Sequence, residues 1–99
     1  MTIFCFDIDQ TICTTANTDY FGASPIPERI EKINLLFAQG HTIKFLTARG
    51  SKTGMDWREL TEGQLASWGV NYHELHLTKP YADFYVDDKG ISDKDFDWT

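Results

Sequence analysis

An apolar stretch near the amino terminus ends in two closely spaced carboxylates. The stretch Thr2 to Ile8 is apolar on both faces of a strand, which is typical of a central strand in a parallel sheet. Because side chains two residues apart on a strand point the same way, Asp7 and Asp9 are expected to share one small space. Two carboxylates in such a space repel each other unless a cation neutralises them, and a hard divalent ion such as Mg²⁺ suits oxygen ligands. The stretch therefore predicts a parallel sheet with a metal site at one edge.

Strand and helix patterns alternate along the rest of the chain. Apolar residues recur at helical spacing from Ile26 to Phe37, and a second helix is expected from Asp56 to Trp68. The remaining expected elements are three strands and one irregular loop or short flap, at Thr42–Leu46, Tyr72–Leu77, Asp83–Val86 and residues 12–25. This alternation implies right-handed crossovers and a parallel sheet that binds ligands at the carboxyl ends of its strands.

Polar residues of the types that bind metal ions or take part in catalysis directly follow each expected strand. They are Asp7 and Asp9, then Thr47, then Lys79, and finally Asp87 and Asp88. Since the carboxyl ends of parallel strands lie at one edge of a sheet, these groups are expected to converge there.

The sequence Asp7-Ile8-Asp9-Gln10-Thr11 matches the pattern D-x-D-x-T at every fixed position. Together with the later residues, it makes the chain resemble the haloacid dehalogenase-like superfamily of phosphohydrolases. Thr47, Lys79 and Asp87-Asp88 match the second, third and fourth motifs of that superfamily, so the resemblance covers residues 3–88. It implies an α/β fold, a three-layer Rossmann-like parallel sheet of strand order 3-2-1-4. No cap domain is expected, because residues 12–25 and 48–56 are too short to hold one.

The resemblance also implies a role for each residue that matches a motif. Asp7 would attack phosphorus and form an aspartyl-phosphate, and Asp9 would act as general acid and base. Thr47 and Lys79 would bind the phosphoryl oxygens. The implied Mg²⁺ ligands are Asp7, the main-chain carbonyl of Asp9, and Asp87 and Asp88, directly or through water.

Arg49 lies two residues beyond Thr47, at the predicted rim. A guanidinium there can bind a phosphate or carboxylate of the substrate through two hydrogen bonds, so Arg49 is a candidate substrate-binding residue. The alternative interpretation is an ordinary surface arginine.

Length and charge limit the classes of function. A chain of 99 residues is predicted to form one domain, residues 1–99. A formal net charge of -6 disfavours nucleic acid as a partner. No apolar run reaches the roughly 18 residues of a membrane span, and the amino terminus lacks the features of a secretion signal, so a cytoplasmic protein is expected. An open, capless site suggests a homo-oligomer whose neighbouring subunit serves as a lid.

Three further segments resemble small, capless proteins associated with bacterial capsule and surface-polysaccharide biosynthesis. They are Ile12-Cys13-Thr14-Thr15, Phe45-Leu46-Thr47-Ala48-Arg49-Gly50 and Lys79-Pro80-Tyr81-Ala82-Asp83. The expected function is a Mg²⁺-dependent phosphatase acting on a small phosphorylated metabolite, a sugar phosphate or polysaccharide precursor. Two alternatives stay open: a nucleotide or polynucleotide end phosphatase, and a non-catalytic phosphate-binding module.

Overall fold

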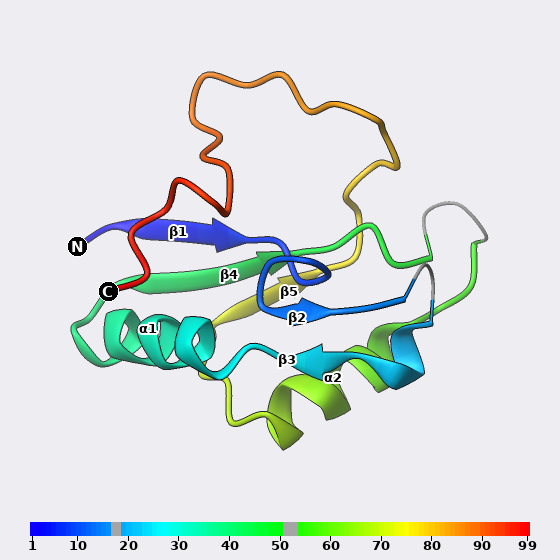
Figure 1. The fold of residues 1–99 in the computed structure, drawn as a ribbon, viewed down its shortest axis with the longest axis horizontal. Helices are drawn as coiled ribbons and strands as arrows, with labels where there is room; N and C mark the ends of the chain where they lie inside the picture. The colour runs from blue at the N-terminus through cyan, green and yellow to red at the C-terminus, as the bar shows by residue number, and fades with distance from the viewer. Residues whose placement is uncertain (17–18, 51–53) are drawn as a thin grey trace.

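A three-stranded parallel sheet forms the centre of the fold (Figure 1). The structure, a computed structural model, describes residues 1–16, 19–50 and 54–99. The strands are β1 (Ile3–Phe6), β4 (Thr42–Leu46) and β5 (Glu74–His76), in the order β1-β4-β5 and all parallel. The register pairs Phe6 with Phe45 and Phe45 with Leu75. The expected small α/β fold with a parallel sheet is therefore confirmed.

Each crossover between neighbouring strands contains one helix, α1 (Pro27–Ala38) or α2 (Arg58–Ser67). Both helices end in a Schellman motif, with Gly40 and Gly69 in the left-handed conformation at φ +93° and +71°. In α1 this motif brings the N–H of His41 to the carbonyl of Leu36, at 3.1 Å. Gly40 and Gly69 thus end the two helices. Within the described ranges, neither helix is long and apolar enough to cross a membrane.

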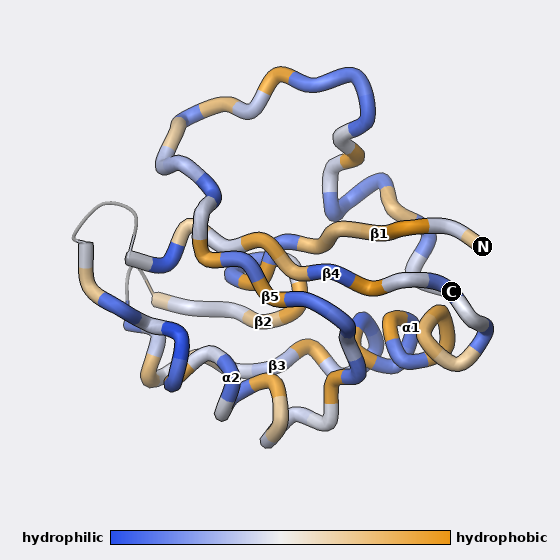
Figure 2. The backbone as a smooth tube through the Cα atoms, turned by 180° about the vertical axis from the view of Figure 1, so that it is seen from behind, coloured by the Kyte–Doolittle hydropathy of each residue, from blue (hydrophilic) through white to orange (hydrophobic). Residues whose placement is uncertain are grey.

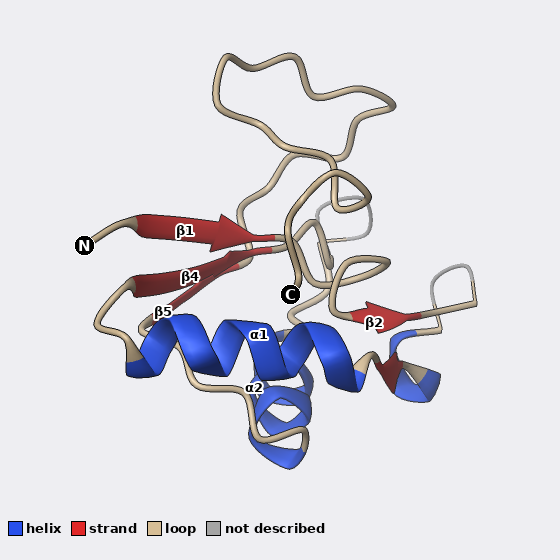
Figure 3. Ribbon diagram, turned by 60° about the vertical axis from the view of Figure 1, so that its left-hand side comes forward, coloured by secondary structure: helices blue, strands red, loops and turns tan. Residues whose placement is uncertain are grey.

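Both helices lie on the same side of the sheet (Figures 2 and 3). Strands added successively in one direction through right-handed crossovers place their helices on one face. The covered face carries the buried side chains of Phe6, Ile43, Phe45 and Leu75. The other face carries the exposed residues Ile3, Cys5, Glu74 and His76. The described residues thus form two layers, whereas three were expected.

A small flap follows β1. It consists of β2 (Cys13–Thr14), the 3₁₀ turn η1 (Tyr20–Gly22) and β3 (Ser24–Pro25), and β2 pairs antiparallel with β3. The flap was expected as a loop over residues 12–25, and two of these residues, 17 and 18, lie outside the described residues. The other short insertion window, residues 48–56, also lies partly outside them.

The strand predicted at Asp83–Val86 is not formed in the structure, which contains no strand at these residues. Phe84 and Val86 are 85% and 98% exposed, and the Tyr85 hydroxyl donates a hydrogen bond back to the Pro80 carbonyl. The segment after β5 extends away from the sheet on the β1 side before the carboxyl-terminal tail returns (Figures 1 and 2). An apolar run becomes a strand only when its backbone pairs with a neighbour, and this run has the composition without the pairing. The fourth strand of the expected order 3-2-1-4, which would lie beside β1, is therefore not confirmed.

The carboxyl-terminal tail returns to the sheet and packs its aromatic residues on β1. Phe96 contacts Phe4 and Phe6 edge to face, with ring centroids 6.0 and 5.5 Å apart. Trp98 lies 5.7 Å from Phe6, and its ring also lies against the guanidinium of Arg29, at 4.8 Å. The tail thus packs partly buried aromatic residues against the hydrophobic core next to α1.

Candidate active site

Three of the predicted site residues lie at the carboxyl ends of neighbouring parallel strands. Asp7 directly follows β1, Thr47 directly follows β4, and Lys79 lies three residues beyond β5. Backbone hydrogen bonds continue the sheet past its last ladder pair: the Thr47 N–H donates to His76 O at 2.9 Å, and the Lys79 N–H donates to Thr47 O at 3.3 Å. The expected convergence at one rim is therefore observed for this part of the site.

Asp7 and Lys79 form a loose ion pair. Lys79 Nζ lies 3.7 Å from Asp7 Oδ1. The Lys79 side chain is 20% exposed and the Asp7 side chain is 35% exposed. The Lys79 ammonium also lies over the Tyr85 ring, 4.3 Å from its centroid. Burial raises the pKa of Asp7 above its ordinary value, and Lys79 only partly opposes that effect. The Asp7 carboxylate is thus desolvated without full compensation of its charge.

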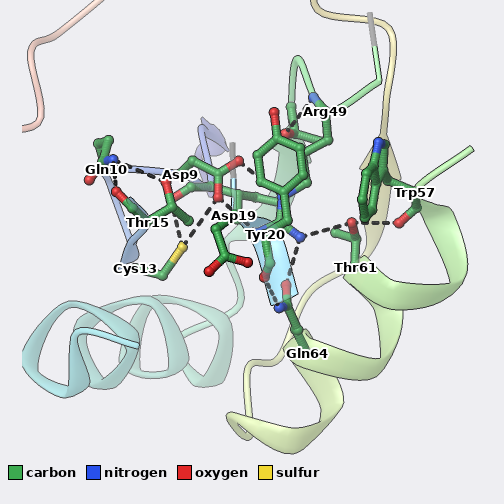
Figure 4. A network of polar contacts seen from close by, with 12 residues as sticks. Asp9, Gln10, Cys13, Thr15, Asp19, Tyr20, Arg49, Trp57, Thr61 and Gln64 are labelled. Atoms are coloured by element: carbon green, nitrogen blue, oxygen red, sulfur yellow. Dashed lines mark hydrogen bonds and ion pairs between the residues drawn. The ribbon is translucent and has the colours of Figure 1, made fainter. Parts of the chain in front are cut away.

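The second aspartate of the motif has a different partner. Arg49 Nε donates to Asp9 Oδ2 at 2.9 Å, and Arg49 Nη2 donates to Asp9 Oδ1 at 2.8 Å. The thiol of Cys13 lies 3.6 Å from Asp9 Oδ1, and burial raises the pKa of this thiol to about 12. Both carboxylate oxygens of Asp9 are therefore bound by residues of the protein (Figure 4).

Arg49 is held by α2 and the flap as well as by Asp9. Its Nη1 donates to Thr61 Oγ1 at 3.1 Å and to Gln64 Oε1 at 2.6 Å, and the Tyr20 ring lies against its guanidinium at 4.8 Å. Gln64 Nε2 in turn donates to the carbonyl of Tyr20 at 2.6 Å (Figure 4). We call Asp9, Arg49, Thr61, Gln64 and Tyr20 the Arg49 cluster.

The sequence did not single out Thr61, Gln64 or Tyr20. The spacing of Thr61 and Gln64 was a signal in the sequence, because residues three apart on a helix lie on the same face and can contact the same partner. Arg49 itself is only 2% exposed, so it is not the surface arginine considered above. Its predicted contact with a substrate would require the guanidinium to leave some of its present partners.

Thr47 is buried and holds the turn that carries Arg49. Its side chain is 1% exposed, and Thr47 Oγ1 accepts a hydrogen bond from the Arg49 N–H at 3.2 Å. In this arrangement the hydroxyl shapes the rim, and its expected contact with a phosphoryl oxygen stays a prediction.

The acidic pair Asp87-Asp88 lies on the exposed segment after β5. Asp87 Oδ1 accepts a hydrogen bond from the Lys89 N–H at 2.9 Å, and this bond is the main cause that lowers the pKa of Asp87. Across the described part of the chain, no three His, Cys, Asp or Glu side chains are placed to hold a metal ion. The structure therefore brings Lys79 to Asp7 but does not gather the four predicted metal-binding residues, and the side chains do not fit Mg²⁺ as they lie.

The candidate site lies on the rim of the sheet, at the carboxyl ends of its strands. Two surface hollows lie elsewhere: one between α1 and the tail, next to Leu35 and Trp98, and one between the flap and α2, next to Phe21 and Leu60. Neither is lined by Asp7 or Lys79. The site is thus defined by the position of its residues at the edge of the sheet.

Comparison with known proteins supports the fold. No family model matches the chain, and no curated protein matches it. The crystal structure of an MCSG target from Vibrio cholerae is similar to this chain with a TM-score of 0.85 and 24% sequence identity, over 95% of this chain and 85% of that one. An identity this low shows the fold alone, so arguments about activity depend on the chemistry of the site.

Proposed function

We propose that the protein is a phosphatase that transfers the phosphoryl group of a small phosphorylated metabolite to Asp7 and then to water. The observation that carries the proposal is the partly desolvated Asp7 carboxylate with Lys79 Nζ at 3.7 Å, at the carboxyl end of a parallel strand. A carboxylate that has lost part of its hydration is a better nucleophile, and a lysine beside it can neutralise charge on the transferring group. Such a pair suits an anionic substrate.

The residues suggest a two-step reaction. In the first step, an Asp7 oxygen forms a bond to phosphorus while the bond to the leaving oxygen breaks, and Asp9 gives a proton to that oxygen. In the second step, Asp9 takes a proton from water, the water oxygen bonds to phosphorus, and Asp7 is released as the carboxylate. Lys79 stabilises the phosphoryl oxygens in both steps.

Mg²⁺ belongs to the proposal, although the acidic pair does not lie near Asp7. We propose that Asp83–Val86 pairs with the free edge of β1, which gives the strand order 3-2-1-4 and carries Asp87 and Asp88 to the carboxyl end of β1. Mg²⁺ would then be held by these residues with Asp7 and the carbonyl of Asp9, and would supply charge neutralisation. Hydrogen exchange at residues 84–86 is expected to slow when Mg²⁺ is added, and unchanged exchange would refute this pairing.

A sugar phosphate or polysaccharide precursor is the proposed substrate class, supported only by the family resemblance. A homo-oligomer and a cytoplasmic location likewise stay predictions. One observation favours the binding-module alternative: Arg49 already occupies both oxygens of Asp9. A module that binds phosphate without turnover would need Lys79 but no free proton donor.

Phosphate release tests the proposal. The purified protein is incubated with p-nitrophenyl phosphate and a panel of sugar phosphates in MgCl₂, with and without a chelator. We expect release that stops with chelator and that falls by at least about 1,000-fold in Asp7→Asn, because the nucleophile is lost. The matched control is Asp56→Asn, an exposed carboxylate that accepts a hydrogen bond from the Arg58 N–H at 3.0 Å and should leave the rate unchanged. Absence of release from every ester would favour the binding module.

A further inference from the structure

The Arg49 guanidinium is buried and its visible partners are all protein groups. It donates to both oxygens of Asp9, to Thr61 Oγ1 and to Gln64 Oε1. No buried side-chain nitrogen or oxygen of the described residues lacks a hydrogen-bond partner. An arginine that only awaited an anionic ligand would present unused donors to solvent, whereas Arg49 makes four hydrogen bonds within the protein, two of them to the second aspartate of the motif.

The groups behind Arg49 hold it in one orientation. The Gln64 amide uses its oxygen for Arg49 and its nitrogen for the Tyr20 carbonyl, which fixes which way the amide faces. Thr61 Oγ1 accepts from Arg49 and donates to the Trp57 carbonyl at 2.7 Å. The Tyr20 ring lies against the guanidinium on one side and meets the Trp57 ring at 5.1 Å. The planar fork of the arginine is therefore held by α2 and the flap together.

We propose that Arg49 is a positioning residue for Asp9, and the proposal rests on the phosphatase function above. A carboxylate offers about four lone-pair sites, and Arg49 donates to one of them on each oxygen of Asp9. Cys13 Sγ lies 3.6 Å from Asp9 Oδ1 and 3.6 Å from the Ile8 carbonyl, so the thiol covers Oδ1 further. The lone pair that remains on Asp9 Oδ2 is the position where Asp9 can carry the proton for the leaving oxygen. Arg49 fixes the direction of that site, since a carboxylate bound through two parallel hydrogen bonds cannot rotate about its last bond.

This role predicts a dependence on the leaving group. p-Nitrophenolate departs without a proton, whereas an alkoxide such as that of glycerol phosphate needs one, so only the second ester requires a correctly placed Asp9. The constant kcat/KM reports the transfer to Asp7 and not the later hydrolysis. It therefore isolates the step in which the leaving oxygen accepts its proton.

The test compares kcat/KM for the two esters in Arg49→Met, Arg49→Lys and wild type. We expect Arg49→Met to lose about 10²–10⁴-fold on glycerol phosphate, the usual contribution of a general acid, and less than about 3-fold on p-nitrophenyl phosphate. Arg49→Lys should recover only part of the loss, because an ammonium lacks the planar fork. In an Asp9→Asn background, Arg49→Met should cause no further loss on glycerol phosphate, since the two residues act as one unit.

Equal losses on both esters would overturn the positioning role, because a structural or phosphate-binding function affects both alike. If Arg49→Met does not fold, Gln64→Met replaces it: this change removes one acceptor from Arg49 and the donor to Tyr20, and the same selective loss, smaller in size, is expected. No turnover of either ester by the wild type would instead refute the proposed function itself. The two failures are thus distinguishable.

Discussion

Replacing Asp9 with alanine is the sharpest test of the Arg49 cluster in the folded protein. The Arg49 side chain is fully buried and the Asp9 side chain is 19% exposed, so each charge is compensated mainly by the other and little by water. Asp9→Ala leaves the guanidinium with Thr61 and Gln64 as its remaining described acceptors. Both are neutral, so they cannot replace the lost counter-charge.

The size of the effect follows from the burial of the pair. Breaking a buried ion pair by removal of one partner costs about 3–5 kcal/mol, and the partial exposure of Asp9 places this case near 3 kcal/mol. A chain of this length has a total unfolding free energy of roughly 5–15 kcal/mol. We therefore expect Asp9→Ala to remove a large part of the stability, with a fall in Tm of about 12–24 °C.

Urea unfolding followed by tryptophan fluorescence measures the loss. The control is Asp83→Ala, which removes an exposed carboxylate and should change the unfolding free energy by less than about 0.5 kcal/mol. The double variant Asp9→Ala/Arg49→Met removes both charges and should be at least about 1 kcal/mol more stable than the sum of the single effects predicts. A loss below about 1 kcal/mol in Asp9→Ala, or strict additivity in the double variant, would refute the reasoning.

Two further predictions concern the rim and the tail. Burial raises the pKa of Asp7 above the 3.8 of the unfolded chain, so ionisation of Asp7 weakens the fold as pH rises through the folded pKa. Asp7→Asn should therefore be more stable than wild type at pH 7 in chelator, and this difference in stability should close below about pH 3.8. Thermal unfolding at several pH values checks this, and a difference independent of pH would contradict it. Phe96→Ala should lower the unfolding free energy by about 2–3 kcal/mol, at or below the lower limit of the roughly 3–5 kcal/mol usual for a buried aromatic residue, because Phe96 is only half-buried against Phe4 and Phe6. Asp95→Ala should change the unfolding free energy little, and equal effects of the two changes in urea unfolding would show that the tail does not contribute to the core.

The parts of the fold that the sequence predicted are those fixed by local chemistry. Apolar periodicity located α1 and β4, and the glycines at 40 and 69 ended the two helices because they adopt a positive φ at low cost. The rim position of Asp7 and Lys79 followed from the parallel direction of the strands, which is a consequence of the crossovers. None of these inferences required knowledge of distant contacts.

Other features depend on partners that a local pattern does not reveal. The composition of Asp83–Val86 resembles a strand, but a strand also needs a paired edge, and Tyr85 instead bonds back to Pro80. Arg49 looked like a residue for substrate because only its position at the rim was visible. Its true surroundings come from α2 and the flap, so its burial against Asp9 could not be read from the residues next to it.

The most direct measurement of the central claim is the location of the phosphoryl group during turnover. The protein is mixed with p-nitrophenyl phosphate in MgCl₂, quenched in acid within one turnover, digested and analysed by mass spectrometry. The account predicts one phosphoryl group on the peptide that contains Asp7, and none on the same peptide from Asp7→Asn. Turnover with the phosphoryl group on another residue, or with no phosphorylated peptide while water oxygen enters phosphate in a single step, would contradict it.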